Sequence, residues 1–452
     1  MRECFELKRK YLPWKYLLLI SLFCVICAVL FFGCRNQKTE PVTLTMWRVY
    51  GSQTDSYMND RIAEFNREAG KDKGITIEIT SVSNSDSIHT ALIASANDEP
   101  GAGKLPDMFV CYPKTAIAMD VDLLDWNTFF SDSEKEWYLP AFMEEGIIDG
   151  KLIVFPVAKS TETVFVNKTI FDRFSADTGF SLDNLTTWEG MFEACEKYFV
   201  WSGGKSFLFY DAPFNFFQFA VRQLGGEFFQ GDRIDFDDPV VMKVWDLWAT
   251  AAIRGHISLQ EGFGTTPMMI GEIVCFIGST ASIAYVKDTV TYPDNTSEPL
   301  ELVVLPYPVF QGAEKSAVQR GVGLCALKGD AGKEKAAAEF AQWFTEKSVN
   351  TDFCIEMGYM PVRKDAYEDL FEGGLDKIET PRQRSLYESI AIMSRDYALY
   401  AAPLFDSYGQ LQNDFQGQMR ALLTPYQQMG TADPAGAVTL SYAKLKEKFG
   451  NR

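Results

Sequence analysis

The sequence predicts an α/β protein built from two lobes. With 452 residues the chain exceeds the usual size of a single hydrophobic core, which favours two domains. Hydrophobic residues make up 47% of the chain, enough to fill a core in each domain. The pattern that follows the N-terminal region alternates between strand and helix periodicity, which is typical of α/β lobes.

The first lobe begins with a strand, a helix and a second strand. Residues 42–47 alternate as a strand does, and apolar residues then recur at helical spacing over 57–65. Gly70 is expected to end this helix, and the isoleucines of 75–79 alternate again. A strand, helix and strand within about forty residues form a βαβ unit, so the two strands are expected to be parallel.

Later segments continue the same alternation. A turn-rich stretch leads into a short apolar run at 107–112, and 302–306 is a similar run, so both are predicted to be buried strands. Residues 272–284 are predicted to form a strand that enters a helix through Gly278, Ser279 and Thr280. Helices are expected from Trp188, over 239–255, around Ala337, over 404–422, and after the capping pair Asp433 and Pro434.

The N-terminus has the features of an export signal. Four basic residues (Lys8, Arg9, Lys10 and Lys15) precede an apolar run at 16–32. That run is about as long as a bilayer-spanning helix, so a retained membrane helix is the alternative. Gly33 and Cys34 resemble the lipobox of bacterial lipoproteins, although Phe31 and Phe32 depart from its pattern. This resemblance implies a signal peptide at 1–33, acylation of Cys34 and a tether over 34–41.

Composition restricts the possible functions. The formal charge of −18 argues against nucleic-acid binding, which needs a basic surface. Beyond Cys34 the chain has an odd number of cysteines without metal-ligand spacing, so no metal or cofactor is expected and the cysteines are interpreted as buried apolar residues. One disulfide remains open. These cysteines are Cys111, Cys195, Cys275, Cys325 and Cys354.

Seven segments in order along the chain resemble one family. They are 44–47, 105–108, 149–156, 224–227, 305–308, 321–323 and 358–364. Together they are similar to the family 1 extracellular solute-binding proteins of carbohydrate-type ABC importers, and nearest in pattern to the glycerol-3-phosphate and glycerophosphodiester branch. The resemblance covers nearly all of 42–450.

The resemblance implies a periplasmic-binding-protein fold with three crossovers and a ligand cleft between the lobes. The N-terminal lobe is expected to comprise 42–159 plus 308–345, and the C-terminal lobe 160–307 plus 346–452. The crossovers are expected near Ser160, Pro308 and Thr345. Rotation of the two lobes about these crossovers would close the cleft over a bound solute.

The same resemblance suggests which residues contact the solute. Gly321 matches a glycine whose backbone approaches the ligand, and Tyr359 a contacting tyrosine. Ser279 and Thr280 match donors to a phosphate, although Ser279 could equally be an ordinary helix cap. The remaining candidates are Tyr50, Tyr112, Ser160, Thr161, Asp211 and Tyr408.

Three details refine this set. Tyr50 could instead only pack at the lobe edge. Ser160 stands where the maltose-binding branch has an acidic sugar ligand, which argues against a maltose-like site. The region of Tyr408 lacks the arginine that grips phosphate in the glycerol-3-phosphate branch, which makes a diester or a neutral solute more plausible than a phosphomonoester.

The sequence therefore predicts a monomeric, lipid-anchored binding protein at the periplasmic face of a bacterial membrane. It is expected to capture a small polyhydroxy solute, with a glycerophosphodiester favoured and a maltodextrin or other sugar as the alternative, and to deliver it to the membrane permease subunits of an ABC importer. An exported hydrolase is the alternative from another class, because acidic pairs such as Glu144 and Glu145 could in principle do acid–base work. Neither histidine lies beside a nucleophile in the sequence, so no enzyme activity is expected. An adhesin or structural lipoprotein would not explain the seven segments.

Overall fold

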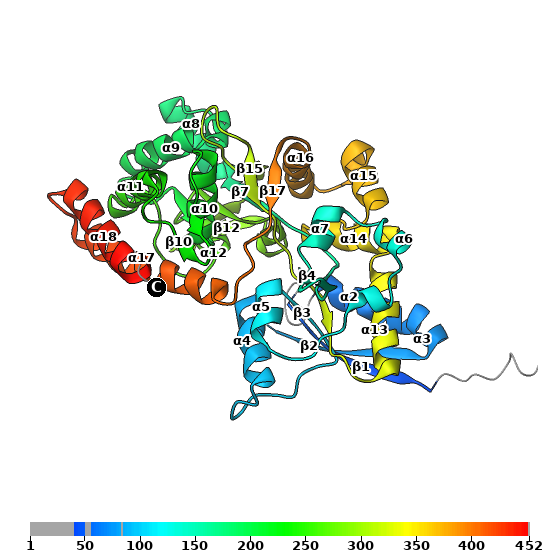
Figure 1. Ribbon diagram of the computed structural model, residues 1–452. Coiled ribbons are helices and arrows are strands. Elements are labelled where there is room, and N and C mark those ends of the chain that lie inside the picture. Colours follow the sequence, from blue (N-terminus) through cyan, green and yellow to red (C-terminus); the bar gives the residue numbers. More distant parts are fainter. Residues whose placement is uncertain (1–39, 50–55, 83–84, 451–452) are drawn as a thin grey trace, which may run out of the picture.

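A computed structural model describes residues 40–49, 56–82 and 85–450, and it contains two principal sheets (Figure 1). The first sheet has the strand order β2-β1-β3-β16-β6. Its first three strands are parallel, and β16 runs antiparallel to both β3 and β6. The strands are β1 (Val42–Arg48), β2 (Ile75–Ser81), β3 (Met108–Cys111), β6 (Phe155–Pro156) and β16 (Gly323–Ala326).

The predicted βαβ unit is confirmed, with one correction. Strands β1 and β2 are parallel and flank helix α2 (Tyr57–Arg67), whose apolar face buries Met58, Ile62 and Phe65. Gly70 does not end this helix; it lies inside a second short helix, α3 (Ala69–Lys73). Gly70 is needed there because a Cβ would lie 2.7 Å from the carbonyl oxygen of Ile75. Gly74, with φ of 70°, makes the turn into β2.

The second sheet has the order β14-β7-β11-β8. Strand β7 is antiparallel to both of its neighbours, β14 and β11, and β8 is parallel to β11. The predicted strands at 272–284 and 302–306 are confirmed as β11 and β14. The strands are β7 (Glu162–Asn167), β8 (Leu208–Tyr210), β11 (Cys275–Ser279) and β14 (Leu302–Leu305).

The core beside the second sheet is rich in aromatic side chains. The rings of Trp188 and Phe216 meet edge to face with their centroids 4.7 Å apart, and Trp248 packs on Phe216 at 4.8 Å. These residues come from α9 (Trp188–Trp201), α10 (Pro213–Gln223) and α11 (Pro239–Ile253). The expected start of α11 is confirmed, because the Asp238 carboxylate accepts the amide of Val240 at 2.8 Å.

The C-terminal helices extend both lobes. Helix α13 (Ala331–Phe344) packs along β1, while α17 (Tyr408–Met429) and α18 (Pro434–Phe449) pack on α11 at the opposite edge of the molecule (Figure 1). Helix α14 (Lys347–Met357) contacts α2 and α13 as well as η3 (Thr280–Tyr285), and α16 (Pro381–Asp396) covers β14. The predicted lobe boundaries at 308 and 345 stay predictions.

The remaining elements are shorter or peripheral. The helices are α4 (Ser85–Ala96), α5 (Pro113–Ala118), η1 (Trp126–Thr128), α6 (Asp132–Lys135), α7 (Pro140–Glu144), α8 (Lys168–Thr178), η2 (Leu182–Thr186), α12 (Thr265–Met269), α15 (Lys364–Gly373) and η4 (Leu375–Lys377). The strands are β4 (Ile147–Ile148), β5 (Lys151–Leu152), β9 (Phe229–Gln230), β10 (Arg233–Ile234), β12 (Thr289–Thr291), β13 (Ser297–Pro299), β15 (Ser316–Val318) and β17 (Ala398–Tyr400).

Three chain segments meet between the two sheets. Residues 157–161 lead from β6 to β7, and residues 319–322 return from β15 to β16. The amides of Ser160 and Arg320 each donate to the other's carbonyl, at 2.8 and 2.7 Å. Lys159 and Met360 pair in the same way. The middle of the molecule is therefore a bundle of extended segments that hydrogen-bond to one another.

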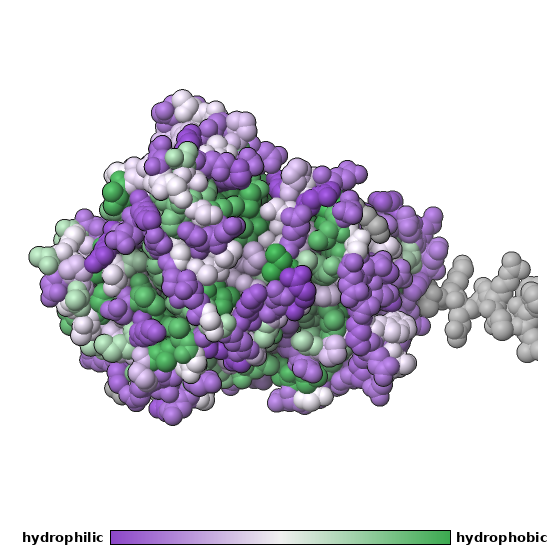
Figure 2. Space-filling view, turned by 90° about the horizontal axis from the view of Figure 1, so that it is seen from above, coloured by the Kyte–Doolittle hydropathy of each residue, from purple (hydrophilic) through white to green (hydrophobic). Residues whose placement is uncertain are grey.

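Five cysteines of the described residues are free and buried, which confirms their interpretation as core residues. None of the helices in the described part of the chain is long and apolar enough to cross a membrane. The apolar run at 16–32 and Cys34 lie outside the described residues. Seen from above, the surface is mainly hydrophilic with separate hydrophobic patches (Figure 2).

Candidate ligand site

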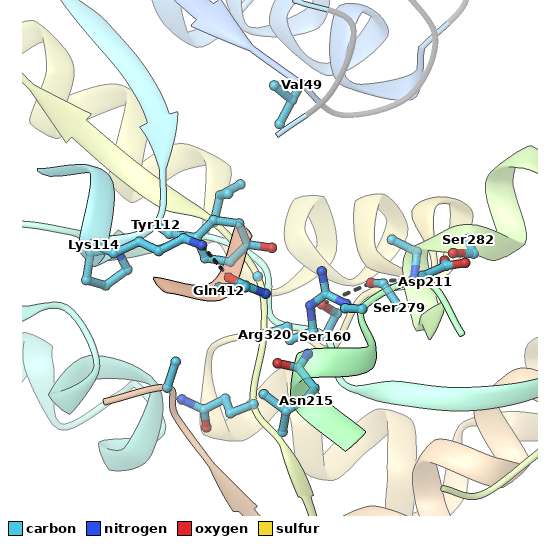
Figure 3. Close-up of a pocket in the computed structure, with 18 of the residues that line it drawn as sticks. Val49, Tyr112, Lys114, Ser160, Asp211, Asn215, Ser279, Ser282, Arg320 and Gln412 are labelled. Carbon is cyan, nitrogen blue, oxygen red and sulfur yellow. Dashed lines mark hydrogen bonds between the residues drawn. The ribbon is translucent and has the colours of Figure 1, made fainter. Parts of the chain in front are cut away.

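A cavity of about 460 Å³ is lined by residues that lie at the ends of strands of both sheets (Figure 3). Its volume is in the range of ligand pockets. Its lining residues come from the loop after β3 and from α5, from the loop after β8, from α10, β11 and α17, and from the segments that join the two sheets. Its lining includes Val49, Tyr112, Lys114, Glu145, Ser160, Asp211, Asn215, Phe263, Ser279, Ser282, Tyr285, Arg320, Gly321, Tyr359, Tyr408, Gln412, Asn413 and Gln416.

Seven of the residues singled out in the sequence line this cavity. They are Tyr112, Ser160, Asp211, Ser279, Gly321, Tyr359 and Tyr408. Thr161 and Thr280 do not line it, because both side chains are fully buried; the Thr161 hydroxyl donates to the Val318 carbonyl at 2.8 Å. Tyr50 lies outside the described residues.

Strand ends explain why distant residues meet here. Tyr112 follows β3, Asp211 follows β8, and Ser279 is the last residue of β11. In open α/β sheets the crevice outside the carboxyl ends of the strands is the usual ligand position. Figure 3 shows Tyr112 and Lys114 on one side of the cavity and Asp211 and Ser279 on the other, with Ser160 and Arg320 between them.

Gly321 brings the backbone close to the floor of the cavity. Its φ of +114° is rarely adopted by residues with side chains, and a Cβ would lie 2.6 Å from the Ala158 carbonyl oxygen. Gly321 therefore permits the close approach of the two segments 157–161 and 319–322, whether or not a ligand is present.

The helix after Ser279 is present, but it is a short 3₁₀ helix. Residues Thr280–Tyr285 form a 3₁₀ helix of six residues, and the Ser279 hydroxyl accepts the amide of Ala281 at 3.3 Å. So short a helix gives little dipole for holding an anion, which weakens the phosphate interpretation of this segment. The Ser279 hydroxyl, at the end of β11, also donates at 3.3 Å to the hydroxyl of Ser160, which lies on the segment between β6 and β7.

A buried ion pair lies under the floor of the cavity. The Arg320 guanidinium donates to Glu162 Oε1 at 2.8 Å; the Glu162 side chain has no exposed surface, whereas that of Arg320 is 25% exposed. Burial disfavours the charged guanidinium, but Tyr112 and Glu162 outweigh this and raise the pKa of Arg320. Arg320 therefore carries its charge at every physiological pH.

The side chain of Asp211 is a weaker acid than an ordinary aspartate. Its Oδ1 accepts the Gly264 amide at 2.8 Å, while its other oxygen lies against Gly278. Burial raises the pKa of Asp211 to about 7, although the Gly264 amide and the charge of Arg320 act in the opposite direction. Asp211 thus changes charge near neutral pH.

A contact crosses the cavity from one lobe to the other. Lys114 of α5 donates to Gln412 Oε1 of α17 at 2.9 Å. The Lys114 ammonium also lies 5.7 Å from the Tyr112 ring centroid and 5.6 Å from that of Tyr408. The cavity is therefore bounded on one side by a polar and aromatic connection between the lobes.

Several lining residues were not singled out in the sequence. Arg320 directly precedes Gly321, and Lys114 follows Tyr112 by two residues. Their closeness in sequence to these two candidates is the signal that could have identified them. Phe263 and Tyr285 line the cavity and are 54% and 45% exposed. Asn215 also lines the cavity, and its sequence neighbour Phe214 packs in the core.

This arrangement of two α/β lobes around a polar and aromatic cavity, joined by paired extended segments, defines a two-lobed binding protein. The family profile for bacterial extracellular solute-binding proteins matches residues 60–376, and the chain belongs to that family. Within the described residues no three histidine, cysteine or acidic side chains gather as metal ligands.

Solved structures support the fold. UgpB from Mycobacterium tuberculosis in complex with glycerophosphocholine has a TM-score of 0.70 at 16% identity, covering 90% of this chain and 98% of that one. Maltose-bound MalE3 from T. maritima has a TM-score of 0.67 at 17% identity, covering 90% and 100%. An ABC substrate-binding protein from Listeria monocytogenes in complex with cycloalternan has a TM-score of 0.68 at 15% identity, covering 91% and 99%. Comparison with the curated proteins found no match.

Proposed function

We propose that this protein captures a neutral polyhydroxy solute, a sugar or small oligosaccharide, and delivers it to the permease subunits of an ABC importer. The observation that carries the proposal is the composition of the cavity wall, which combines aromatic rings with amide and hydroxyl groups. Sugars are held by aromatic faces against their C–H surface and by hydrogen bonds that replace water.

The polar groups suit hydroxyl ligands. Asn215, Gln412 and Gln416 are amides that donate and accept, and the Asp211 carboxyl accepts. Phe263 and Tyr285 lie on the wall with large exposed surfaces, as stacking requires. The sugar complexes among the similar structures are consistent with this solute class.

A glycerophosphodiester is the second candidate. The UgpB structure contains glycerophosphocholine, and Gly321, Ser279 and Tyr359 line the cavity of this chain. The charge is less favourable for this candidate, because Arg320 is already paired with Glu162 behind the wall and the Asp211 carboxyl lines the cavity. An anionic ligand would have to compete with both carboxylates.

The proposal includes the location of the protein. A lipid on Cys34 and the tether at 34–41 would hold the two lobes at the periplasmic face beside the permease. The protein would act as a monomer without catalysis, because closure of the cleft is all that delivery requires.

A ligand panel tests the proposal. Residues 35–452 are titrated with maltose, maltotriose, glucose, glycerophosphocholine and glycerol 3-phosphate in a thermal-shift assay, followed by calorimetry. Saturable stabilisation by a neutral sugar is expected. A response to glycerophosphocholine alone would replace the sugar with the second candidate, and turnover of any compound would overturn the binding function.

A further inference from the structure

The carboxylate of Glu162 lies behind the cavity wall and does not line the cavity. It is surrounded by donors: Tyr210 gives its hydroxyl at 2.7 Å, Asn215 its amide at 2.7 Å, and Arg320 its guanidinium at 2.8 Å. These three donors hold the buried carboxylate in one position.

Arg320 is the only one of these donors with a full charge, and it faces the cavity. The Arg320 guanidinium donates to Glu162 through Nη1, and it also interacts with the Tyr112 side chain and with the charge of Asp211. The pair therefore offers hydrogen-bond donors at the floor of the cavity with little net charge.

Two other charged side chains near the cavity, Lys159 and Lys114, also have partners. Lys159 and Glu145 form a buried pair at 2.9 Å, and Lys114 donates to Gln412 between two tyrosine rings. Asp211 contributes only part of a negative charge near neutral pH, because burial raises its pKa to about 7. Removal of the Glu162 charge would leave Arg320 compensated mainly by Asp211, whose own pKa is raised to about 7.

Resting on the proposed function, we propose that Glu162 determines the ligand class: by neutralising Arg320 from behind the wall, it makes the cavity accept uncharged solutes and reject phosphorylated or sulfated ones. Glu162 is a positioning residue in this role, since it acts through Arg320 and touches no ligand. Loss of its charge converts the floor of the cavity into an anion site.

The test uses inorganic sulfate, whose charge is constant from pH 6 to pH 8. Wild type, Glu162→Gln and the matched control Tyr210→Phe, which alters the same network without a change of charge, are titrated with sodium sulfate at constant ionic strength. Glu162→Gln is expected to bind sulfate about tenfold more tightly than wild type, with a larger gain at pH 6, where Asp211 is more protonated. Tyr210→Phe is expected to behave as wild type.

The gain must depend on Arg320. In the double variant Glu162→Gln with Arg320→Gln it is expected to disappear, and a gain that survives would overturn the inference. Equal sulfate affinity in wild type and Glu162→Gln, or a gain in Tyr210→Phe, would overturn it as well. Glu162→Met provides a second charge-removing variant, and cooperative urea unfolding verifies that each variant is folded.

The outcomes separate this inference from the proposed function. A wild type that binds no sugar, combined with a sulfate gain in Glu162→Gln, would reject the sugar proposal and keep the role of Glu162. A wild type that binds sugar, combined with no sulfate gain in Glu162→Gln, would keep the sugar proposal and reject the role of Glu162. Where a sugar binds, the ratio of its affinity to that of glucose 6-phosphate should fall about tenfold in Glu162→Gln.

Discussion

The backbone amides of Ser160 and Arg320 donate to each other's carbonyl groups, at 2.8 and 2.7 Å. Ser160 lies on the segment between β6 and β7, and Arg320 lies on the segment between β15 and β16. Both residues line the cavity. The point where the lobes connect is therefore also the floor of the candidate ligand site. A change in the relative orientation of the lobes must bend these segments, so ligand contacts at the floor can bias closure directly.

Gly321→Ala should destabilise the fold by about 2–4 kcal/mol. The added Cβ would collide with the carbonyl oxygen of Ala158 at 2.6 Å, in a conformation that already disfavours a side chain. Gly150→Ala is the control, because Gly150 has a φ of +76° but nothing within 4 Å of its Cβ position. It should cost only about 1 kcal/mol. Urea unfolding of both variants measures the difference, and equal losses would contradict the close contact.

Lys159→Met should cost about 3–5 kcal/mol, because it leaves the buried carboxylate of Glu145 without its cation. The side chains of this pair are only 3% and 7% exposed. A matched surface pair, Lys446 and Asp237, has side chains 47% and 89% exposed, and Lys446→Met should cost about 0–1 kcal/mol. Chemical denaturation at pH 7 compares the two. If Lys159→Met were as mild as Lys446→Met, the Glu145 pair would not contribute as a buried pair does.

Asp211→Asn should change the pH dependence of stability. In the folded chain the pKa of Asp211 is raised to about 7, above the value of about 3.9 for an unfolded chain. The folded state therefore holds this proton more tightly, and the wild type should lose stability as pH rises from about 4 to about 7. Asn has no such proton, so the variant should gain on the wild type by up to a few kcal/mol over that window.

Urea unfolding at several pH values measures this gain. Asp294→Asn is the control of opposite sign, because hydrogen bonds from Thr296 lower the pKa of that exposed carboxyl. Parallel stability curves for wild type and Asp211→Asn between pH 4 and pH 8 would show that the Asp211 carboxyl is not perturbed.

Phe263→Ala and Tyr285→Ala should each weaken sugar binding by about tenfold, through loss of a stacking face, and change stability by less than about 0.5 kcal/mol. Both side chains are largely exposed at the cavity. Trp137→Ala is the control, because Trp137 is 49% exposed but does not line the cavity. Calorimetry with the sugar identified in the panel gives the affinities. Unchanged affinity in both cavity variants would exclude stacking on these rings.

Local patterns were sufficient for most elements. The alternation at 42–47 and 75–79 and the cap at Asp238 predict β1, β2 and the start of α11 because these signals act over a few residues. Gly70 was misinterpreted because a glycine can end a helix or allow a close contact inside one, and only the packing against Ile75 distinguishes the two. The 3₁₀ form of Thr280–Tyr285 also has no clear local signal.

The candidate site was predicted in part. Tyr112, Asp211 and Ser279 stand at strand ends, a position that the sequence can indicate. Thr161 and Thr280 directly follow the lining residues Ser160 and Ser279, but one step along the chain turns each side chain from the cavity into the core.

By itself the sequence determined the α/β class, the order of the main elements and the family pattern, because these follow from short-range periodicity and turn chemistry. Only the tertiary structure decided which polar groups share a cavity and which charges cancel. Glu162 and Arg320 are 158 residues apart, and their pairing depends on two passages between the lobes lying side by side. Electrostatic interaction depends on distance in space and on burial, neither of which is encoded in local sequence.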